Sequence, residues 1–215
     1  GTIGATFYVI GIGFLYAATG TLNMADMAAR LATLSDSSVV QTGFAFVVVG
    51  LGIKAAMFPL HGWLPGAYSY APSLIGIFLA ATATKTSIYL MARFVFDVFP
   101  NGAAFGQGFI TSVLVPLAAA AAIVCSPQAV FAKEIRRVLA FSPVAQFGVI
   151  LLGLSSSSVA GASAGLFYLA AHALMKMTLF MALGGLAISL GARRIDELAG
   201  VARDAPWSAV AFGVG

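Results

Sequence analysis

The chain has 215 residues, of which 60% are hydrophobic and 8% are charged, and its formal net charge is +4. Soluble domains carry about 25% charged residues, so this composition excludes a soluble globular domain and a basic nucleic-acid-binding tail. A single cysteine, Cys125, excludes a disulfide framework, an iron–sulfur cluster and a cysteine-based zinc site. The sequence therefore predicts a protein that crosses a membrane several times.

The apolar residues form long runs separated by short connections. A helix that crosses the hydrocarbon core needs about 20 mostly apolar residues. Six runs meet this criterion and the start of a seventh follows: 2–22, 42–60, 72–98, 108–131, 138–155, 162–190 and 206–215. We expect an all-α, polytopic membrane helix bundle in a single domain over residues 1–215. Because the chain opens and stops inside apolar runs, we expect it to be an internal piece of a longer subunit.

The connections carry most of the charge and predict the orientation. Residues 23–41 contain Ser and Asp residues that are typical of helix ends, and they predict a short interfacial helix. Loops 61–71, 132–137 and 191–205 follow the second, fourth and sixth runs, so they lie on one side. That side has the basic residues Lys133, Arg136, Arg137, Arg193, Arg194 and Arg203, and the opposite side has Arg30 and Arg93. The positive-inside rule therefore predicts that the three loops are cytoplasmic.

Three lysines lie where a charge is costly. Lys54 lies past the middle of the second run, and Lys85 and Lys176 lie near the centres of the third and sixth. An ionised lysine at the bilayer centre costs about 2.5–3.5 kcal/mol on insertion scales. Burial also favours the neutral form, so such a lysine can take up and release a proton. The pattern favours a proton relay; the alternative is a set of lysines neutralised by acidic partners that lock helices together.

Two histidines extend this pattern. His172 precedes Lys176 by four residues, which places both on one helix face, one turn apart. Histidine titrates near neutral pH, so His172 is a candidate relay group or else a hydrogen-bonded core residue. His61 ends the second run and is either an entry group or an interfacial residue. Two separated histidines predict neither a metal nor a haem site, and we expect no cofactor.

Proline and glycine mark breaks and contacts within the runs. Pro59 lies five residues after Lys54, and a proline in this position interrupts a helix beside an ionisable group, as in ion pathways. Three glycine pairs within apolar runs predict close helix packing: Gly11 and Gly13, Gly50 and Gly52, and Gly184 and Gly185. No acidic residue lies deep in a run, so the lysines have no counter-ion within this sequence.

Four ordered motifs resemble one family. KAAMFPLHGWLPGAYSYAPS at 54–73 with TKTSIYLMARF at 84–94, KEIRRVLAFSPVAQFGVILLGL at 133–154, HALMKMTLFMALGGL at 172–186 and RRIDELAGVARDAP at 193–206 are similar to antiporter-like membrane subunits. These occur in respiratory complex I, Mrp-type cation/proton antiporters and membrane-bound hydrogenases. The resemblance covers nearly the whole chain.

The resemblance implies a fold of about fourteen transmembrane helices with two inverted repeats and two broken helices. This chain would run from the sixth helix into the twelfth. Lys54 would match the lysine of the first broken helix, Lys85 that of the next helix, and His172 and Lys176 the pair in the eleventh. A glutamate that pairs with Lys54 would lie upstream, and the ionisable residue of the second broken helix would lie downstream.

The function that these observations predict is proton or monovalent-cation translocation in a larger complex of the bacterial inner membrane. The partners would be other membrane subunits, H⁺ and, as a second ion, Na⁺. TGTLNMADMAARL and RRIDELAGVARDAP resemble the Mrp D-type subunit more than complex I; a complex I or hydrogenase subunit is the alternative. The chain would have no catalytic site of its own, although complex I as a whole oxidises NADH with quinone. A structural scaffold is a further alternative, and a stand-alone transporter is disfavoured because no polar cluster of substrate size is present.

Overall fold

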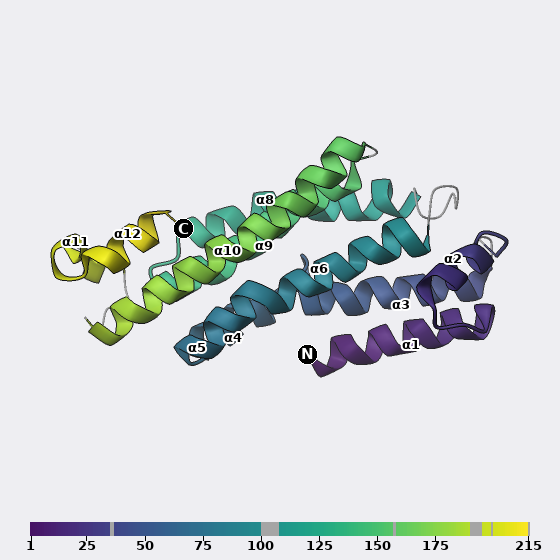
Figure 1. The fold of residues 1–215 in the computed structure, drawn as a ribbon, viewed down its shortest axis with the longest axis horizontal. Helices are drawn as coiled ribbons and strands as arrows, with labels where there is room; N and C mark the ends of the chain where they lie inside the picture. The colour runs from purple at the N-terminus through teal and green to yellow at the C-terminus, as the bar shows by residue number, and fades with distance from the viewer. Residues whose placement is uncertain (35–36, 100–107, 157, 190–194, 199, 215) are drawn as a thin grey trace.

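The computed structural model describes residues 1–34, 37–99, 108–156, 158–189, 195–198 and 200–214. Within these ranges the chain is helical, and its long helices lie side by side in an elongated bundle (Figure 1). Six helical stretches are long and apolar enough to span a membrane: Thr2–Thr19, Ser38–Ala55, Ser73–Val98, Ile110–Val130, Ile135–Ser155 and Val159–Ile188. The prediction of an all-α bundle with six spans is confirmed.

The second span breaks close to where Pro59 predicted. Helix α3 (Ser38–Ala55) ends four residues before this proline, because Ala56 adopts a left-handed conformation with φ of 54°. The N–H of Met57 then donates to the carbonyl oxygen of Gly52 at 2.8 Å, and the N–H of Ala56 donates to Ile53 at 3.2 Å, which is the Schellman pattern. The chain resumes in α4 (Trp63–Tyr70), and the indole N–H of Trp63 donates back to Ile53 at 2.8 Å. The helix is therefore shorter than the run 42–60.

The third span is one continuous helix that contains two π-turns. It consists of α5 (Ser73–Phe78), the π-turn η1 (Leu79–Ala83), α6 (Thr84–Arg93) and the π-turn η2 (Phe94–Val98). A π-turn closes i→i+5 hydrogen bonds and is often found at functional sites. The sequence did not predict either turn, and η1 ends two residues before Lys85.

Helices α1 (Thr2–Thr19) and α3 pack antiparallel through pairs of glycines. A Cβ atom at Gly11 would lie 2.7 Å from the carbonyl oxygen of Gly43, and one at Gly4 would lie 2.9 Å from that of Gly50. Because the two pairs are seven residues apart on each helix, both lie on one face. The predicted role of Gly11 and Gly50 in close packing is confirmed, whereas a Cβ at Gly13 would meet nothing within 4 Å.

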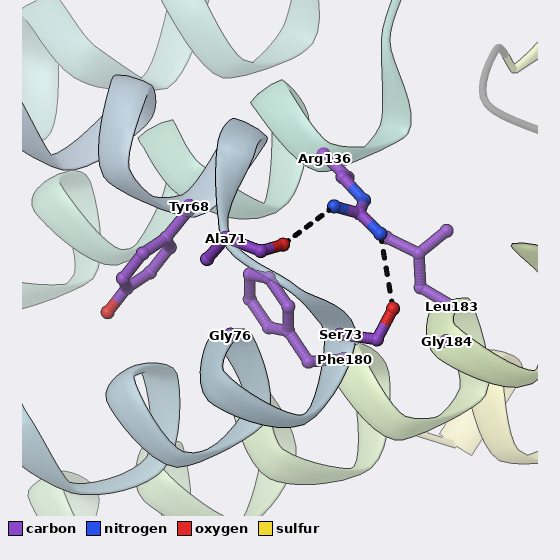
Figure 2. Close-up of a pocket in the computed structure, with 8 residues that line it drawn as sticks. All are labelled: Tyr68, Ala71, Ser73, Gly76, Arg136, Phe180, Leu183 and Gly184. Atoms are coloured by element: carbon purple, nitrogen blue, oxygen red, sulfur yellow. Dashed lines mark hydrogen bonds between the residues drawn. The ribbon is translucent and has the colours of Figure 1, made fainter.

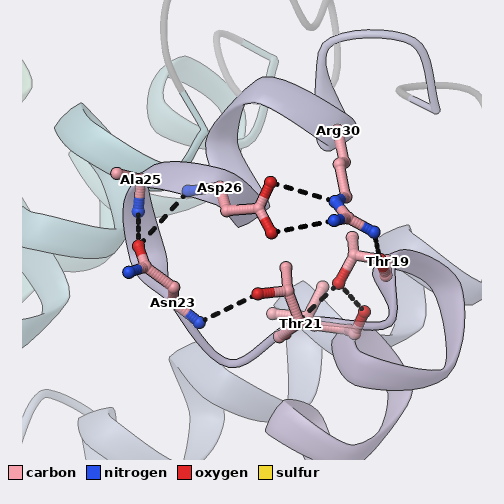
Figure 3. A network of polar contacts seen from close by, with 7 residues as sticks. Thr19, Thr21, Asn23, Ala25, Asp26 and Arg30 are labelled. Atoms are coloured by element: carbon pink, nitrogen blue, oxygen red, sulfur yellow. Dashed lines mark hydrogen bonds and ion pairs between the residues drawn. The ribbon is translucent and has the colours of Figure 1, made fainter.

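The predicted interfacial helix within 23–41 is α2 (Met24–Leu31), at one end of the bundle. Asn23 caps it, because its side-chain oxygen accepts from the N–H groups of Ala25 at 2.9 Å and Asp26 at 3.3 Å. Arg30 then joins α2 to α1: it forms an ion pair with Asp26 at 3.0 Å and donates to the carbonyl oxygen of Thr19 at 2.8 Å. Figure 3 shows this network.

The fourth, fifth and sixth spans alternate in direction, and in the described part of the chain three short helical elements follow the sixth span. The fourth consists of the π-turn η3 (Ile110–Leu114) and α8 (Val115–Val130), the fifth is α9 (Ile135–Ser155) and the sixth is α10 (Val159–Ser189). The 3₁₀ turn η4 (Asp196–Leu198), α11 (Val201–Asp204) and α12 (Pro206–Val214) follow.

Hydrogen bonds bring the three predicted cytoplasmic loops to one end of the bundle. Arg136 donates to the carbonyl oxygen of Ala71 at 3.0 Å, which joins the second loop to the first. The N–H of Ile195 donates to the carbonyl oxygen of Lys133 at 3.3 Å, which joins the third loop to the second. Residues 191–194 of the third loop, with Arg193 and Arg194, and its residue 199 lie outside the described residues. The three loops thus share one end, and their cytoplasmic location remains a prediction.

Candidate functional site

Lys85 is buried in the middle of the third span. Its side chain is 6% exposed, and its ammonium group donates a hydrogen bond to the carbonyl oxygen of Ala80 in the π-turn η1. The same ammonium group lies 5.3 Å from the centre of the Phe147 ring, which comes from α9. A cation over an aromatic face gains about 0.5–2 kcal/mol. Lys85 therefore has neutral partners, a carbonyl and a ring.

Lys176 is buried on α10 and also has a neutral partner. It is 5% exposed, and its Nζ donates to Oγ of Ser142 on α9 at 2.5 Å. The ammonium groups of Lys85 and Lys176 lie within electrostatic range of each other. Two positive charges in one buried site repel, so protonation of one lysine disfavours protonation of the other.

His172 lies within electrostatic range of both lysines. It is 2% exposed, and neither of its ring nitrogens has a hydrogen-bond partner among the described residues. Its ring meets the edge of Phe147 at a centroid distance of 5.5 Å and stacks on Tyr168 at 6.3 Å. Phe147 thus contacts both Lys85 and His172. A buried histidine with two unpartnered nitrogens can accept or donate a proton when a neighbour or a water molecule reaches it.

A further polar pair borders this cluster. The hydroxyl of Tyr168 donates to Oε1 of Gln146 at 2.5 Å. Tyr168, Gln146 and Ser142 were not predicted as site residues, although their spacing in the sequence carries a signal. Ser142 and Gln146 are four residues apart on α9, and Tyr168, His172 and Lys176 follow one another at the same interval on α10. Two polar stripes at helical spacing in apolar helices indicate facing polar surfaces.

Lys54 and His61 have other neighbours. Lys54 lies in the last turn of α3, and its side chain is exposed on the surface of the bundle, with its stem beside Gly4. His61 lies in the break between α3 and α4, where Nε2 is 3.8 Å from Sγ of Cys125 and the ring stacks on Phe58. Burial lowers the pKa of His61. The structure therefore brings Lys85, His172 and Lys176 into one cluster, and it places Lys54 and His61 outside that cluster.

This buried cluster of Lys85, His172 and Lys176 suits proton transfer. Each member can hold or release one proton, and the surroundings are neutral oxygens and aromatic rings. Among the described residues, no three His, Cys, Asp or Glu side chains gather in a way that would hold a metal ion. The ion pairs Asp26–Arg30, Arg93–Asp97 and Glu134–Arg137 join partly exposed side chains three or four residues apart. Such exposed pairs contribute little to stability, because water and salt screen the two charges.

Comparison with known proteins agrees with the fold. The family model described as "NADH:quinone oxidoreductase/Mrp antiporter, TM" matches residues 1–215. NADH-quinone oxidoreductase subunit N of Desulforudis audaxviator is 44% identical over 212 residues, which are 99% of this chain and 42% of that protein.

Two solved structures are similar throughout the chain. A chain of the archaeal membrane-bound sulfane sulfur reductase, described as a respiratory membrane complex, superposes with a TM-score of 0.89 at 34% identity, covering 99% of this chain and 43% of that one. A chain of the Mrp complex from Dietzia sp. DQ12-45-1b superposes with a TM-score of 0.88 at 34% identity, covering 99% and 38%. This chain therefore spans less than half the length of the relatives that it matches.

Proposed function

Since the chain belongs to the NADH:quinone oxidoreductase/Mrp antiporter transmembrane family, we propose that it forms part of a subunit that moves protons across a membrane within a larger complex. One observation carries the proposal: Lys85, His172 and Lys176 are buried together on neighbouring membrane-spanning helices, with neutral partners. Ionisable residues inside a membrane are costly and mark ion pathways. Burial in a packed, uncharged surrounding favours a relay over lysines that only lock helices through acidic partners.

The proposed relay works by electrostatic coupling. A proton on Lys176 disfavours a proton on Lys85, and His172 is in electrostatic range of both. A positive charge that arrives near Lys85 therefore favours transfer of the Lys85 proton toward His172 and Lys176. Lys54 supplies this charge in the proposal: separating it from an acidic partner elsewhere in the complex would release its proton toward Lys85. The exposed side chain of Lys54 leaves room for such a partner.

The type of complex is a finer proposal. The sequence motifs favour an Mrp D-type subunit, and the superposition on a chain of an Mrp complex supports this choice. The alternative, a proton-pumping subunit of complex I or a related respiratory complex, is supported by the 44% identity with an NADH-quinone oxidoreductase subunit N and by the respiratory complex of the archaeal neighbour. In either case the partners are further membrane subunits, the transported ions are H⁺ with or without Na⁺, and the basic loops face the cytoplasm of a bacterium.

The test follows proton movement in inverted vesicles that contain the full-length subunit in its complex. Na⁺ and NADH are added separately, and a pH-sensitive dye reports the response. The variant is Lys85→Ala, and the control is Thr86→Ala, which changes the exposed neighbour on the same helix. A Na⁺-driven signal that Lys85→Ala abolishes supports an Mrp-type antiporter, and an NADH-driven signal that it abolishes supports a respiratory complex. An unchanged signal from a normally assembled Lys85→Ala complex would refute the relay and favour a scaffold.

A further inference from the structure

A small pocket lies at the end of the bundle that carries the three predicted cytoplasmic loops. Figure 2 shows the residues that line it: Tyr68, Ala71, Ser73, Gly76, Arg136, Phe180, Leu183 and Gly184. Its rim is half-buried, and its floor is formed by buried residues of α4, α5 and α10. Arg136 lies at the rim and donates to the carbonyl oxygens of Ser69 and Ala71 and to Oγ of Ser73. The pocket therefore joins the basic end of the bundle to its interior.

Tyr68 connects this pocket to the helix that carries Lys85. It is 2% exposed, and its ring packs edge-to-face on Phe180 at 5.4 Å. In Figure 2 its hydroxyl points away from Arg136. That hydroxyl donates to the carbonyl oxygen of Leu79 at 3.2 Å. The ammonium group of Lys85 donates to the carbonyl oxygen of Ala80, the next residue of the π-turn. The carbonyl groups of two consecutive residues thus accept hydrogen bonds from Tyr68, which lines the pocket, and from Lys85.

Thr84 supplies a further buried hydroxyl on the helix that carries Lys85. It is fully buried at the start of α6, next to Lys85 in sequence, and its Oγ1 has no hydrogen-bond partner among the described residues. It lies beside the phenol of Tyr68, close enough to interact but without hydrogen-bond geometry. Leaving a buried hydroxyl without a hydrogen bond is destabilising, so this group is available to donate to, or accept from, a water molecule or the Tyr68 phenol.

We infer that Tyr68 and Thr84 form the proton path between this pocket and Lys85. The inference rests on the proposed function and adds the branch through which the relay exchanges protons with the membrane face that carries the basic loops. Each hydroxyl donates one proton and accepts another. A proton that enters at the pocket therefore moves through Tyr68 and Thr84 to the amine of Lys85, and each hydroxyl ends with the number of protons it had at the start. The reverse order releases a proton from the Lys85 ammonium group to the pocket.

The chemistry of this path selects protons over metal cations. The guanidinium of Arg136 at the rim repels Na⁺ and K⁺. Among the residues that line the pocket, none carries a carboxylate that would replace the hydration shell of a cation. A proton passes by exchange between hydroxyl groups and needs no such ligand. Na⁺, where the complex transports it, therefore takes another route.

The test uses the full-length complex in inverted vesicles, with Lys85→Ala measured in parallel. The variants are Thr84→Val, which keeps the shape and removes the hydroxyl, and Tyr68→Phe. Thr84→Ser restores the hydroxyl, and Ser87→Ala is the control, because Ser87 is a buried hydroxyl on the same helix that donates to its own backbone at Ala83.

The expected result is an approximately tenfold slower proton signal in Thr84→Val and Tyr68→Phe, equivalent to about 1.4 kcal/mol in the barrier. A larger H₂O/D₂O rate ratio should accompany it, because proton transfer has become limiting. Thr84→Ser should recover the rate, and Ser87→Ala should leave both quantities unchanged. Normal rates and isotope ratios in assembled Thr84→Val and Tyr68→Phe would overturn the path, and so would slower rates without a change in the isotope ratio. Failure of Lys85→Ala to reduce the signal would instead overturn the relay itself.

Discussion

The contact between α1 and α3 allows a prediction whose size follows from the structure. A Cβ atom at Gly11 would lie 2.7 Å from the carbonyl oxygen of Gly43 and 2.7 Å from the amide nitrogen of Val47. Ordinary contact begins at 3.4 Å, so the alanine methyl group is about 0.7 Å too close to each atom. Both atoms belong to the backbone of α3 and cannot rotate away. The variant Gly11→Ala therefore separates the two helices.

The matched control lies two residues further along the same helix. Gly13→Ala adds the same methyl group at a position where nothing lies within 4 Å. Both variants gain the same helix propensity, up to about 1 kcal/mol. Their difference therefore isolates the packing term, for which overfilling a packed site costs about 1–3 kcal/mol. We expect Gly11→Ala to be less stable than Gly13→Ala by this amount.

The assay is reversible unfolding of the purified full-length subunit in mixed micelles, followed by circular dichroism as the fraction of denaturing detergent rises. Proton transport by the assembled complex should also fall in Gly11→Ala, because the same glycine face supports the end of α3 where Lys54 lies beside Gly4. Equal unfolding free energies for Gly11→Ala and Gly13→Ala would refute the close approach of the two helices.

Two other predictions concern the polar groups. Ser142→Ala removes the acceptor of the Lys176 ammonium; because a hydrogen bond to a charged group contributes about 1.5–3 kcal/mol, proton transport should fall roughly 10- to 100-fold. Ser142→Thr should keep most of the rate, and a Ser142→Ala rate equal to wild type would contradict this role. The hydrogen bond and ion pair with Arg30 hold the pKa of Asp26 below its usual value. Their stabilisation of α2 is therefore present above the ordinary pKa of an aspartate, about 3.9, and is lost as pH falls through the lowered pKa. A nitroxide attached at Ala29→Cys should become more mobile over that acidic interval, whereas in an Asp26→Asn background its mobility should not change with pH.

Much of the fold could be predicted from the sequence, because burial in a membrane leaves a strong signal. Runs of about 20 apolar residues correspond to the six spans. His172 and Lys176 were placed on one face by their spacing of four, and both are buried. The break near Pro59 was also foreseen, since proline interrupts a helix. These features depend on local sequence and on the free-energy cost of burying a charge in a membrane. Both can be read from one sequence.

The partners of the buried groups could not be predicted, since they depend on how helices far apart in sequence pack. Ser142 binds Lys176 across 34 residues, and Phe147 reaches Lys85 from another helix. The sequence also did not locate the end of α3, because Ala56 adopts a left-handed conformation that usually favours glycine. Lys54 was expected to share an axis with the other lysines; its connection to them remains a prediction, since its side chain is exposed on this chain.

The π-turn before Lys85 also determines the direction in which that side chain leaves its helix. Successive residues of an α-helix are rotated by about 100° around the axis, and a π-turn holds one residue more than an α-turn. Removal of a single residue between Leu79 and Ala83 would let the helix rewind as a regular α-helix. The part that precedes the turn and the part that follows it would then differ by about 100° in angular phase. Either Lys85 would rotate away from Phe147, or the carbonyl of Leu79 would rotate away from Tyr68. A surface loop can accommodate the deletion of one residue. The same deletion within η1 would break the contacts between the basic end of the bundle and its buried lysines.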